Sequence, residues 1–209
     1  MFFEKGEIYH IYNRGNNRQK IFFEDENYIY FLKKIKQHIA PNCEILAWCL
    51  MPNHFHLMVF ANDKSIQTSI SGVAKVNNLS KGFKTLLSSY TRAINKKFNR
   101  TGSLFTQNTK SKCLTNFSLN ESLVRIGGKN VQVNYVNSCF HYIHQNPLRA
   151  RLVSKMEDWN YSSFKDYMNV RNGKLCNKEL AYNYLDIDSK TFYADSHGVI
   201  DDAIIEKLF

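Results

Sequence analysis

One hairpin limits what this chain can fold into more than any other feature. The segment CEILAWCLM, residues 43–51, is apolar at nearly every position, and Pro52-Asn53 joins it to HFHLMVF, residues 54–60. A strand that is apolar on both faces is typical of the centre of a sheet covered by helices. The Pro-Asn pair predicts a tight turn between two strands. The sequence therefore predicts a central hairpin whose second strand carries two histidines.

The segments around this hairpin complete a fold class. Residues 7–15 are expected to form a strand that ends in a turn, and apolar side chains recur at helical spacing from Asp25 to Pro41. The order strand, helix, strand, strand, helix, strand predicts an α+β, ferredoxin-like split βαβ fold, an antiparallel sheet with helices on one face. The other expected elements are a long basic helix over 65–98 broken near Gly72 or Gly82, a strand within 101–114, a loop over 115–131 and a helix over 132–146 halted by Pro147.

Length and composition fit one main domain with an appendage. The 209 residues, 44% of them hydrophobic, are enough to bury a core. We expect the main domain to span residues 1–153. Residues 154–209 alternate short helical patterns with loops, which predicts a C-terminal helical appendage ending in an acidic tail.

The distribution of charge indicates a polyanionic partner. The formal net charge is +10, and ten basic residues but no Asp or Glu lie between Lys64 and Lys112. Neutralising phosphates releases counterions and drives association, so this stretch predicts nucleic-acid binding. From Glu179 to Phe209 seven acids face two lysines. That acidic tail could fold over the basic groove, pack as a helical cap or stay a solvated extension.

The sequence also predicts a compartment. Its apolar stretches are far shorter than the roughly 18 to 20 residues that span a bilayer, and its first residues do not resemble a signal peptide. The five cysteines are scattered and lack the C-x2-C spacing of a zinc knuckle or redox pair. We therefore expect reduced thiols, a cytoplasmic location and no membrane partner.

The two histidines of the hairpin are the first candidates for chemistry. Side chains alternate along a strand, so His54 and His56 share one face, about 7 Å apart. Two imidazoles placed in this way can converge on one cation. Two hydrogen-bonded, partly buried histidines of a core strand would show the same spacing, so the pair alone leaves both interpretations open.

A helix near residue 140 carries the second candidates. Residues four apart share a helix face, which places Tyr142 and Asn146 together at the edge of the core stripe and turns Gln145 toward solvent. At such an edge a phenol packs against the sheet and exposes its hydroxyl, as an ordinary boundary tyrosine also does. Two imidazoles and an amide oxygen would leave a metal with an open position, where it polarises a phosphoryl oxygen for attack by a tyrosine. A covalent phosphodiester conserves the energy of the broken bond, which suits breaking and rejoining a strand better than simple hydrolysis.

Five segments, in this order, resemble the IS200/IS605-type transposases and in particular the REP-associated tyrosine transposases, which are single-tyrosine members of the HUH endonuclease superfamily. The segments are YHIYNRGNNRQKIFFEDENYIYFL, AWCLMPNHFHLMV, YTRAINKKFNRTGSLF, YIHQNPLRARLV and WNYSSFKDY. The resemblance covers roughly residues 6–168, so it implies that residues 1–153 form a catalytic domain of this type.

The resemblance also implies a role for each matching position. His54 and His56 match the ligands of a catalytic Mg²⁺ or Mn²⁺, and Asn146 matches the third ligand. Residues 144–145 are close enough along the helix to remain alternatives for that third ligand. Tyr142 matches the nucleophile that forms a 5′-phosphotyrosine.

The implied function is metal-dependent cleavage and rejoining of single-stranded DNA, with recognition of a DNA hairpin. A homodimer is common among the insertion-sequence relatives, whereas REP-associated relatives need not form one.

The residues expected to contact DNA are Arg14, Arg18, Lys81, Lys84, Arg92, Lys96, Lys97, Arg100 and Arg149. Tyr90, Phe98 and Phe105 either stack on unpaired bases or belong to the core. Two other functions stay open: a domesticated, non-catalytic nucleic-acid-binding protein of the same fold, and a metal-dependent phosphodiesterase acting on nucleotides.

Overall fold

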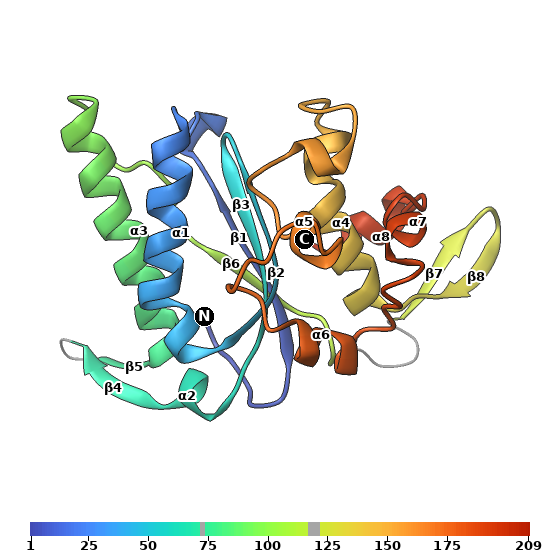
Figure 1. Cartoon of the computed structure of the whole chain (residues 1–209). Helices are drawn as coiled ribbons and strands as arrows, with labels where there is room; N and C mark the ends of the chain where they lie inside the picture. The colour runs from blue at the N-terminus through green and yellow to red at the C-terminus, as the bar shows by residue number, and fades with distance from the viewer. Residues whose placement is uncertain (72–73, 117–121) are drawn as a thin grey trace.

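An antiparallel four-stranded sheet forms the centre of the molecule (Figure 1). The computed structural model describes residues 1–71, 74–116 and 122–209. The order of the strands across the sheet is β2-β3-β1-β6, so the predicted hairpin, β2–β3, has its second strand inside the sheet. The bounds of these strands are β1 Ile8–Arg14, β2 Glu44–Met51, β3 His54–Phe60 and β6 Lys110–Cys113.

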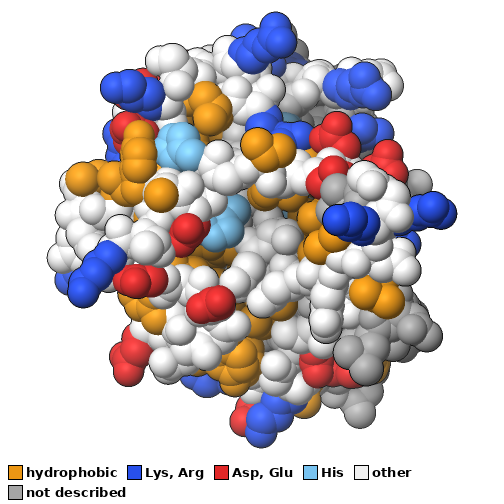
Figure 2. All heavy atoms as spheres, turned by 90° about the vertical axis from the view of Figure 1, so that its right-hand side faces the viewer, with side chains coloured by type: hydrophobic (Ala, Val, Ile, Leu, Met, Phe, Trp, Pro, Cys, Tyr) orange, Lys and Arg blue, Asp and Glu red, His pale blue; other side chains and the backbone are white. Residues whose placement is uncertain are grey.

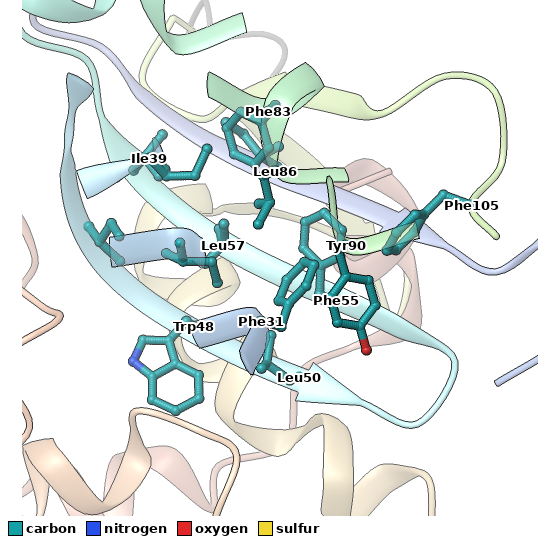
Figure 3. Close-up of a cluster of buried hydrophobic side chains, with 14 of the residues drawn as sticks. Phe31, Ile39, Trp48, Leu50, Phe55, Leu57, Phe83, Leu86, Tyr90 and Phe105 are labelled. Atoms are coloured by element: carbon teal, nitrogen blue, oxygen red, sulfur yellow. The ribbon is translucent and has the colours of Figure 1, made fainter. Parts of the chain in front are cut away.

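One face of the sheet is covered by two long helices, α1 (Asp25–His38) and α3 (Asn78–Lys97). This is the helical layer that the order of elements predicts. Figure 3 shows its core, in which Phe105 meets Phe55 of β3 and Tyr90 of α3. All three side chains are buried, and the Tyr90 hydroxyl donates to the Ile21 carbonyl at 2.7 Å. The core interpretation of Tyr90 and Phe105 is therefore confirmed.

The opposite face of the sheet is covered by α4 (Tyr135–Arg149) and by the segment that follows it (Figure 1). The two faces of β3 divide between the layers as strand alternation predicts. Leu57 packs in the core with α1 and α3, whereas Met58 packs in the core with α4. This second layer was not part of the predicted arrangement, and its position brings α4 over the histidine-bearing face of β3.

The long helix expected over residues 65–98 is wrong in its first third. A short helix α2 (Asp63–Ile66) and a hairpin of β4 (Thr68–Ser71) and β5 (Ala74–Asn77) precede α3. The side chain of Asn77 accepts from the Ser80 amide and caps α3, which explains why the helix starts there. Gly82 does not break α3. A Cβ at this residue would lie 2.3 Å from the His38 carbonyl oxygen, so glycine allows α3 to approach α1 closely. Gly72 lies outside the described residues.

Part of the loop expected over residues 115–131 is a hairpin of β7 (Leu123–Ile126) and β8 (Lys129–Gln132). Gly127 and Gly128 both have positive φ, at 56° and 82°, as a tight hairpin turn requires. Residues 117–121 lie outside the described part. Helix α4 also extends two residues beyond Pro147, which lies in its last turn.

The segment after residue 153 packs on the molecule at two places. Residues 161–163 run along the free edge of β2, where the Leu50 amide donates to Tyr161 and the Ser163 amide donates to Trp48. Further along, Phe164 and Phe192 pack with Phe140 of α4. Its helices are α5 Phe164–Tyr167, α6 Lys178–Tyr184, α7 Phe192–Ser196 and α8 Asp202–Lys207, and the 3-10 turns of the chain are Asn16–Arg18, Ala40–Asn42 and Met156–Asp158.

The division into two domains at residue 153 stays a prediction about folding units, since the later segment shares its core with α4. Within residues 1–71, 74–116 and 122–209, we find no helix with the length and apolar character needed to span a membrane.

Candidate active site

Strand pairing places the two histidines among polar residues of β1. His54 and His56 open β3, opposite Arg14 and Tyr12 of the antiparallel neighbour β1. Residues directly opposite in an antiparallel pair point to the same face, so all four side chains lie on the face that α4 covers. The imidazole centroids of His54 and His56 are 4.9 Å apart.

Helix α4 brings the predicted tyrosine and asparagine to this pair. The Tyr142 ring meets the His56 ring edge to face, with centroids 5.9 Å apart. Asn146 is buried one turn later, and its Nδ2 donates to the Tyr142 carbonyl at 2.8 Å. Asn146 also interacts with His54, and this hydrogen bond raises the His54 pKa against the larger effect of burial. All four predicted residues therefore meet at one place.

The two alternatives for the third ligand are directed elsewhere. Gln145 is 5% exposed and its Nε2 donates to the carbonyls of Ser196 and Gly198, at 2.9 and 2.8 Å. The expectation that Gln145 faces solvent is wrong, because the segment around α7 covers that side of the helix. The His144 ring is hydrogen-bonded to the Ser163 hydroxyl at 2.7 Å. Asn146 is thus the side chain of the three that faces the histidine pair.

Burial sets the protonation states at this site. It lowers the pKa of His54, with Arg14 adding to the effect, and it lowers the pKa of His56 well below its usual range, with His54 and His10 adding to it. Both imidazoles are therefore neutral at neutral pH and each keeps one lone pair. Burial raises the pKa of Tyr142 to about 12, so the phenol is protonated at rest.

The nitrogen atoms of the two histidines suit a divalent cation, and one observation in particular supports this. Nε2 of His56 is buried and has no hydrogen-bond partner, which is costly for a polar atom unless a ligand satisfies it. Nδ1 of His54 is hydrogen-bonded to Oδ1 of Asn53 at 2.6 Å, so Nε2 is the ring nitrogen that this bond does not use. Across the described ranges, no group of three His, Cys, Asp or Glu side chains is placed to hold a metal. A metal here would depend on the Asn146 amide and on oxygen atoms from substrate or water.

The site opens into a cleft of about 740 Å³. His54, His56 and Tyr142 line it, together with two of the arginines expected to contact DNA, Arg14 and Arg18. Both arginine side chains are exposed. A phosphate that reached the histidines would therefore pass two positive charges at the cleft wall.

A second hollow, of about 890 Å³, runs along α3 and is lined by Lys84 and Arg92. The two hollows share Asn13, near the end of β1, and the loop residues 106–108, so they are adjacent. Lys84 and Arg92, which belong to the helical layer on the other face of the sheet, therefore line a hollow that adjoins the histidine cleft.

The other basic residues of this stretch take different positions. Lys81 and Lys96 are exposed on α3. Lys97 forms an ion pair with Glu24, and Arg100 donates to Gln19 at 2.7 Å. Their DNA contacts stay predictions, as do those of the residues that line the hollows.

The acidic tail lies over α4 and reaches the cleft. Figure 2 views the side of the molecule that carries α7, α8 and the β7–β8 hairpin, where acidic side chains are spread over the face and Lys and Arg lie mostly toward its rim. Asp202 of α8 pairs with Arg149 of α4 at 3.0 Å, so this arginine, expected at DNA, has an internal partner. Phe209 lines the cleft, with its ring centroid 5.5 Å from that of Tyr142. Of the three interpretations of the tail, these contacts support packing as a helical cap, whereas competition with DNA stays a prediction.

Sequence reasoning missed two residues of the site, His10 and Phe209. The alternation of YHIYNR could have placed His10 on the face of Tyr12 and Arg14, but only the pairing of β1 with β3 brings it to His56, where the two rings are hydrogen-bonded with centroids 5.0 Å apart. No local pattern marks Phe209.

Comparisons with known proteins identify the family and support the fold. A family model described as "Transposase IS200 like" matches residues 5–112, just over half of the chain. Among solved structures, a REP-associated tyrosine transposase bound to a REP hairpin superposes with a TM-score of 0.56 at 15% sequence identity, covering 81% of this chain and 83% of that one. At this identity the likeness is one of fold. A search of curated proteins finds no match.

Proposed function

This chain belongs to the IS200-like transposase family, and from that premise we propose that it cleaves and rejoins single-stranded DNA through a covalent bond between Tyr142 and a 5′-phosphate. His54, His56 and Asn146 would hold Mg²⁺ or Mn²⁺. The metal would supply a positive charge that polarises the scissile phosphate. The contact that carries the proposal is that of the Tyr142 ring with His56, whose Nε2 is unpaired and buried.

The covalent step balances without an added energy source. Oη of Tyr142 attacks the phosphorus, the Oη–P bond forms and the bond from phosphorus to the 3′-oxygen breaks. The proton lost by Oη ends on the released 3′-oxygen, directly or through water. Because the phosphodiester is conserved as a tyrosine ester, the reverse attack by a 3′-hydroxyl rejoins a strand.

Proton loss from Tyr142 is the demanding part of this step. Burial raises the pKa of this phenol to about 12, and among the groups around it Arg149 and Asn146 lower that pKa. A phenol is a weak nucleophile while it is protonated. We therefore expect the reaction to be slow unless a bound metal ion brings further positive charge to the site.

The hollows indicate how DNA would reach the tyrosine. Lys84 and Arg92 would bind the backbone along α3, and the shared residues 106–108 would pass the strand to Arg14 and Arg18. The structural relative is bound to a REP hairpin, and a hairpin is the DNA that we propose for this chain.

A tyrosine-to-phenylalanine pair tests the proposal. With a 3′-labelled single-stranded oligonucleotide that carries a hairpin, and with Mn²⁺ or Mg²⁺, the wild-type protein should form a labelled, denaturation-resistant protein–DNA adduct. Tyr142→Phe should form none. Tyr12→Phe is the matched control, because Tyr12 lines the same cleft and its hydroxyl donates to the Phe209 carbonyl at 3.3 Å.

An adduct in Tyr142→Phe would show that another group is the nucleophile. A wild-type protein that binds the hairpin but forms no adduct with either metal would favour the non-catalytic binding protein instead.

A further inference from the structure

A chain of two hydrogen bonds lies behind His56. The carbonyl of Leu208 meets Nδ1 of His10 at 3.2 Å, and Nε2 of His10 meets Nδ1 of His56 at 2.8 Å. The remaining nitrogen of the two rings, Nε2 of His56, is buried without a hydrogen-bond partner, and the His56 ring meets the Tyr142 ring edge to face.

The positions of the protons in these two hydrogen bonds follow from the Leu208 carbonyl. A carbonyl only accepts, so Nδ1 of His10 must carry a proton. His10 is 0% exposed, and among the ion pairs of the described residues none involves it. A buried imidazolium without a counter-ion is costly, so the ring is neutral and its Nε2 is a lone pair. The proton between the two rings therefore belongs to Nδ1 of His56.

We infer that His10 is a positioning residue, which holds His56 in the tautomer and orientation that present the Nε2 lone pair to the metal position. This inference rests on the proposed function. Ring partners of this kind orient metal-binding histidines and raise their basicity. Asn53 does the same for His54 through the 2.6 Å contact at Nδ1. Each of the two predicted ligands is thus oriented by a hydrogen bond at its Nδ1.

The choice of imidazole as the acceptor has a physical consequence. A carboxylate behind His56 would fix the same tautomer, but it would add a negative charge beneath the place where a DNA phosphate must approach. A neutral histidine fixes the tautomer without that charge. In addition, because Leu208 completes the chain, the packing of the segment after α8 is coupled to the tautomer of His56.

Two substitutions of similar volume separate positioning from simple packing. His10→Gln keeps an oxygen that can accept from Nδ1 of His56, whereas His10→Leu keeps bulk but offers no acceptor. His144→Leu is the control, because His144 is also 0% exposed and its ring is hydrogen-bonded to Ser163 rather than to His56. The readouts are the His56 tautomer, from long-range proton–nitrogen NMR of the metal-free protein, and Mn²⁺ affinity from calorimetry.

We expect wild-type His56 to carry its proton on Nδ1. In His10→Leu the proton should move toward Nε2, and the Kd for Mn²⁺ should rise about 10- to 100-fold, as for other second-layer partners of metal ligands. His10→Gln should recover most of both properties, and His144→Leu should leave both within about twofold of wild type.

Two results would overturn the inference: a wild-type His56 protonated on Nε2, or a His10→Leu protein that matches His144→Leu in tautomer and affinity. The wild-type spectrum alone decides the first of these even if a variant does not fold. Failure of the proposed function is distinguishable, because the wild-type protein would then bind no Mn²⁺. The tautomer shift in His10→Leu would still support the positioning role, and its absence would still refute it.

Discussion

The ring of Phe209 should limit access of DNA to Tyr142. It lines the cleft, and its centroid is 5.5 Å from that of Tyr142, 6.1 Å from that of His56 and 4.9 Å from that of Tyr12. A phosphate that approaches the tyrosine would have to displace this ring. Phe209→Ala removes the obstacle and leaves the backbone carbonyls of this segment in place.

The size of the effect follows from the covered area. Phe209 is 48% exposed, so about half of its surface is buried. Full burial of an aromatic side chain covers about 150–250 Å², so about 100 Å² is covered here. At about 25 cal/mol per Å² the contact is worth about 2.5 kcal/mol. Removing it should raise the apparent affinity for single-stranded DNA by up to about 60-fold, and less where the freed ring regains rotamer entropy.

The assay is cleavage of a labelled hairpin oligonucleotide under single-turnover conditions, with DNA binding measured in parallel. Tyr184→Ala is the matched control, because Tyr184 is also 48% exposed and its ring packs on Phe60 instead. Phe209→Ala should bind and cleave faster than wild type, and Tyr184→Ala should not. If the two variants behave alike, Phe209 does not obstruct the cleft and this reasoning fails.

Three further outcomes follow from the same geometry. Asn146→Ala should raise the Kd for Mn²⁺ by at least about tenfold, and Asn146→Asp should lower it because a carboxylate adds negative charge to the metal-binding atoms. If calorimetry gives both variants the Mn²⁺ affinity of the wild-type protein, Asn146 is not a ligand. Burial lowers the pKa of His10 to about 4 and lowers that of His144, so below pH 6.5 the unfolded chain binds protons that the folded protein does not. Urea unfolding should therefore show stability falling by about 1.4 kcal/mol per pH unit for each such histidine as the pH falls from 6.5 toward 4, and a pH-independent midpoint in that range would contradict it. Replacing Lys84 and Arg92 together by Gln should reduce the slope of log K against log salt for single-stranded DNA by about 1.4, and an unchanged slope would place the strand elsewhere.

Local periodicity was enough to predict several parts of the candidate site. Strand alternation placed His54 and His56 on one face, and helical spacing placed Tyr142 and Asn146 on one face of α4. These predictions hold because side-chain direction within one element depends only on the backbone geometry of that element. The five sequence segments that resemble the transposases indicated the family, and the family model supports this assignment over residues 5–112.

Predictions that depended on a neighbouring segment were less successful. Gln145 was expected in solvent because its own helix cannot show that Ser196 and Gly198 cover it. The hairpin before α3 was missed, since its residues also fit a continued helical pattern.

The sequence by itself therefore determined the strand and the helix that carry the candidate site, the faces of these two elements and the residue types able to bind a metal and attack a phosphate. Only the tertiary structure decided which side chains from other elements contact these candidate site residues. His10 reaches His56 through the register of β1 against β3, and Leu208 and Phe209 reach the same place from about 150 residues further along the chain. Register and long-range packing are set by the burial of whole faces against one another, and no local pattern around His10 or Phe209 encodes them.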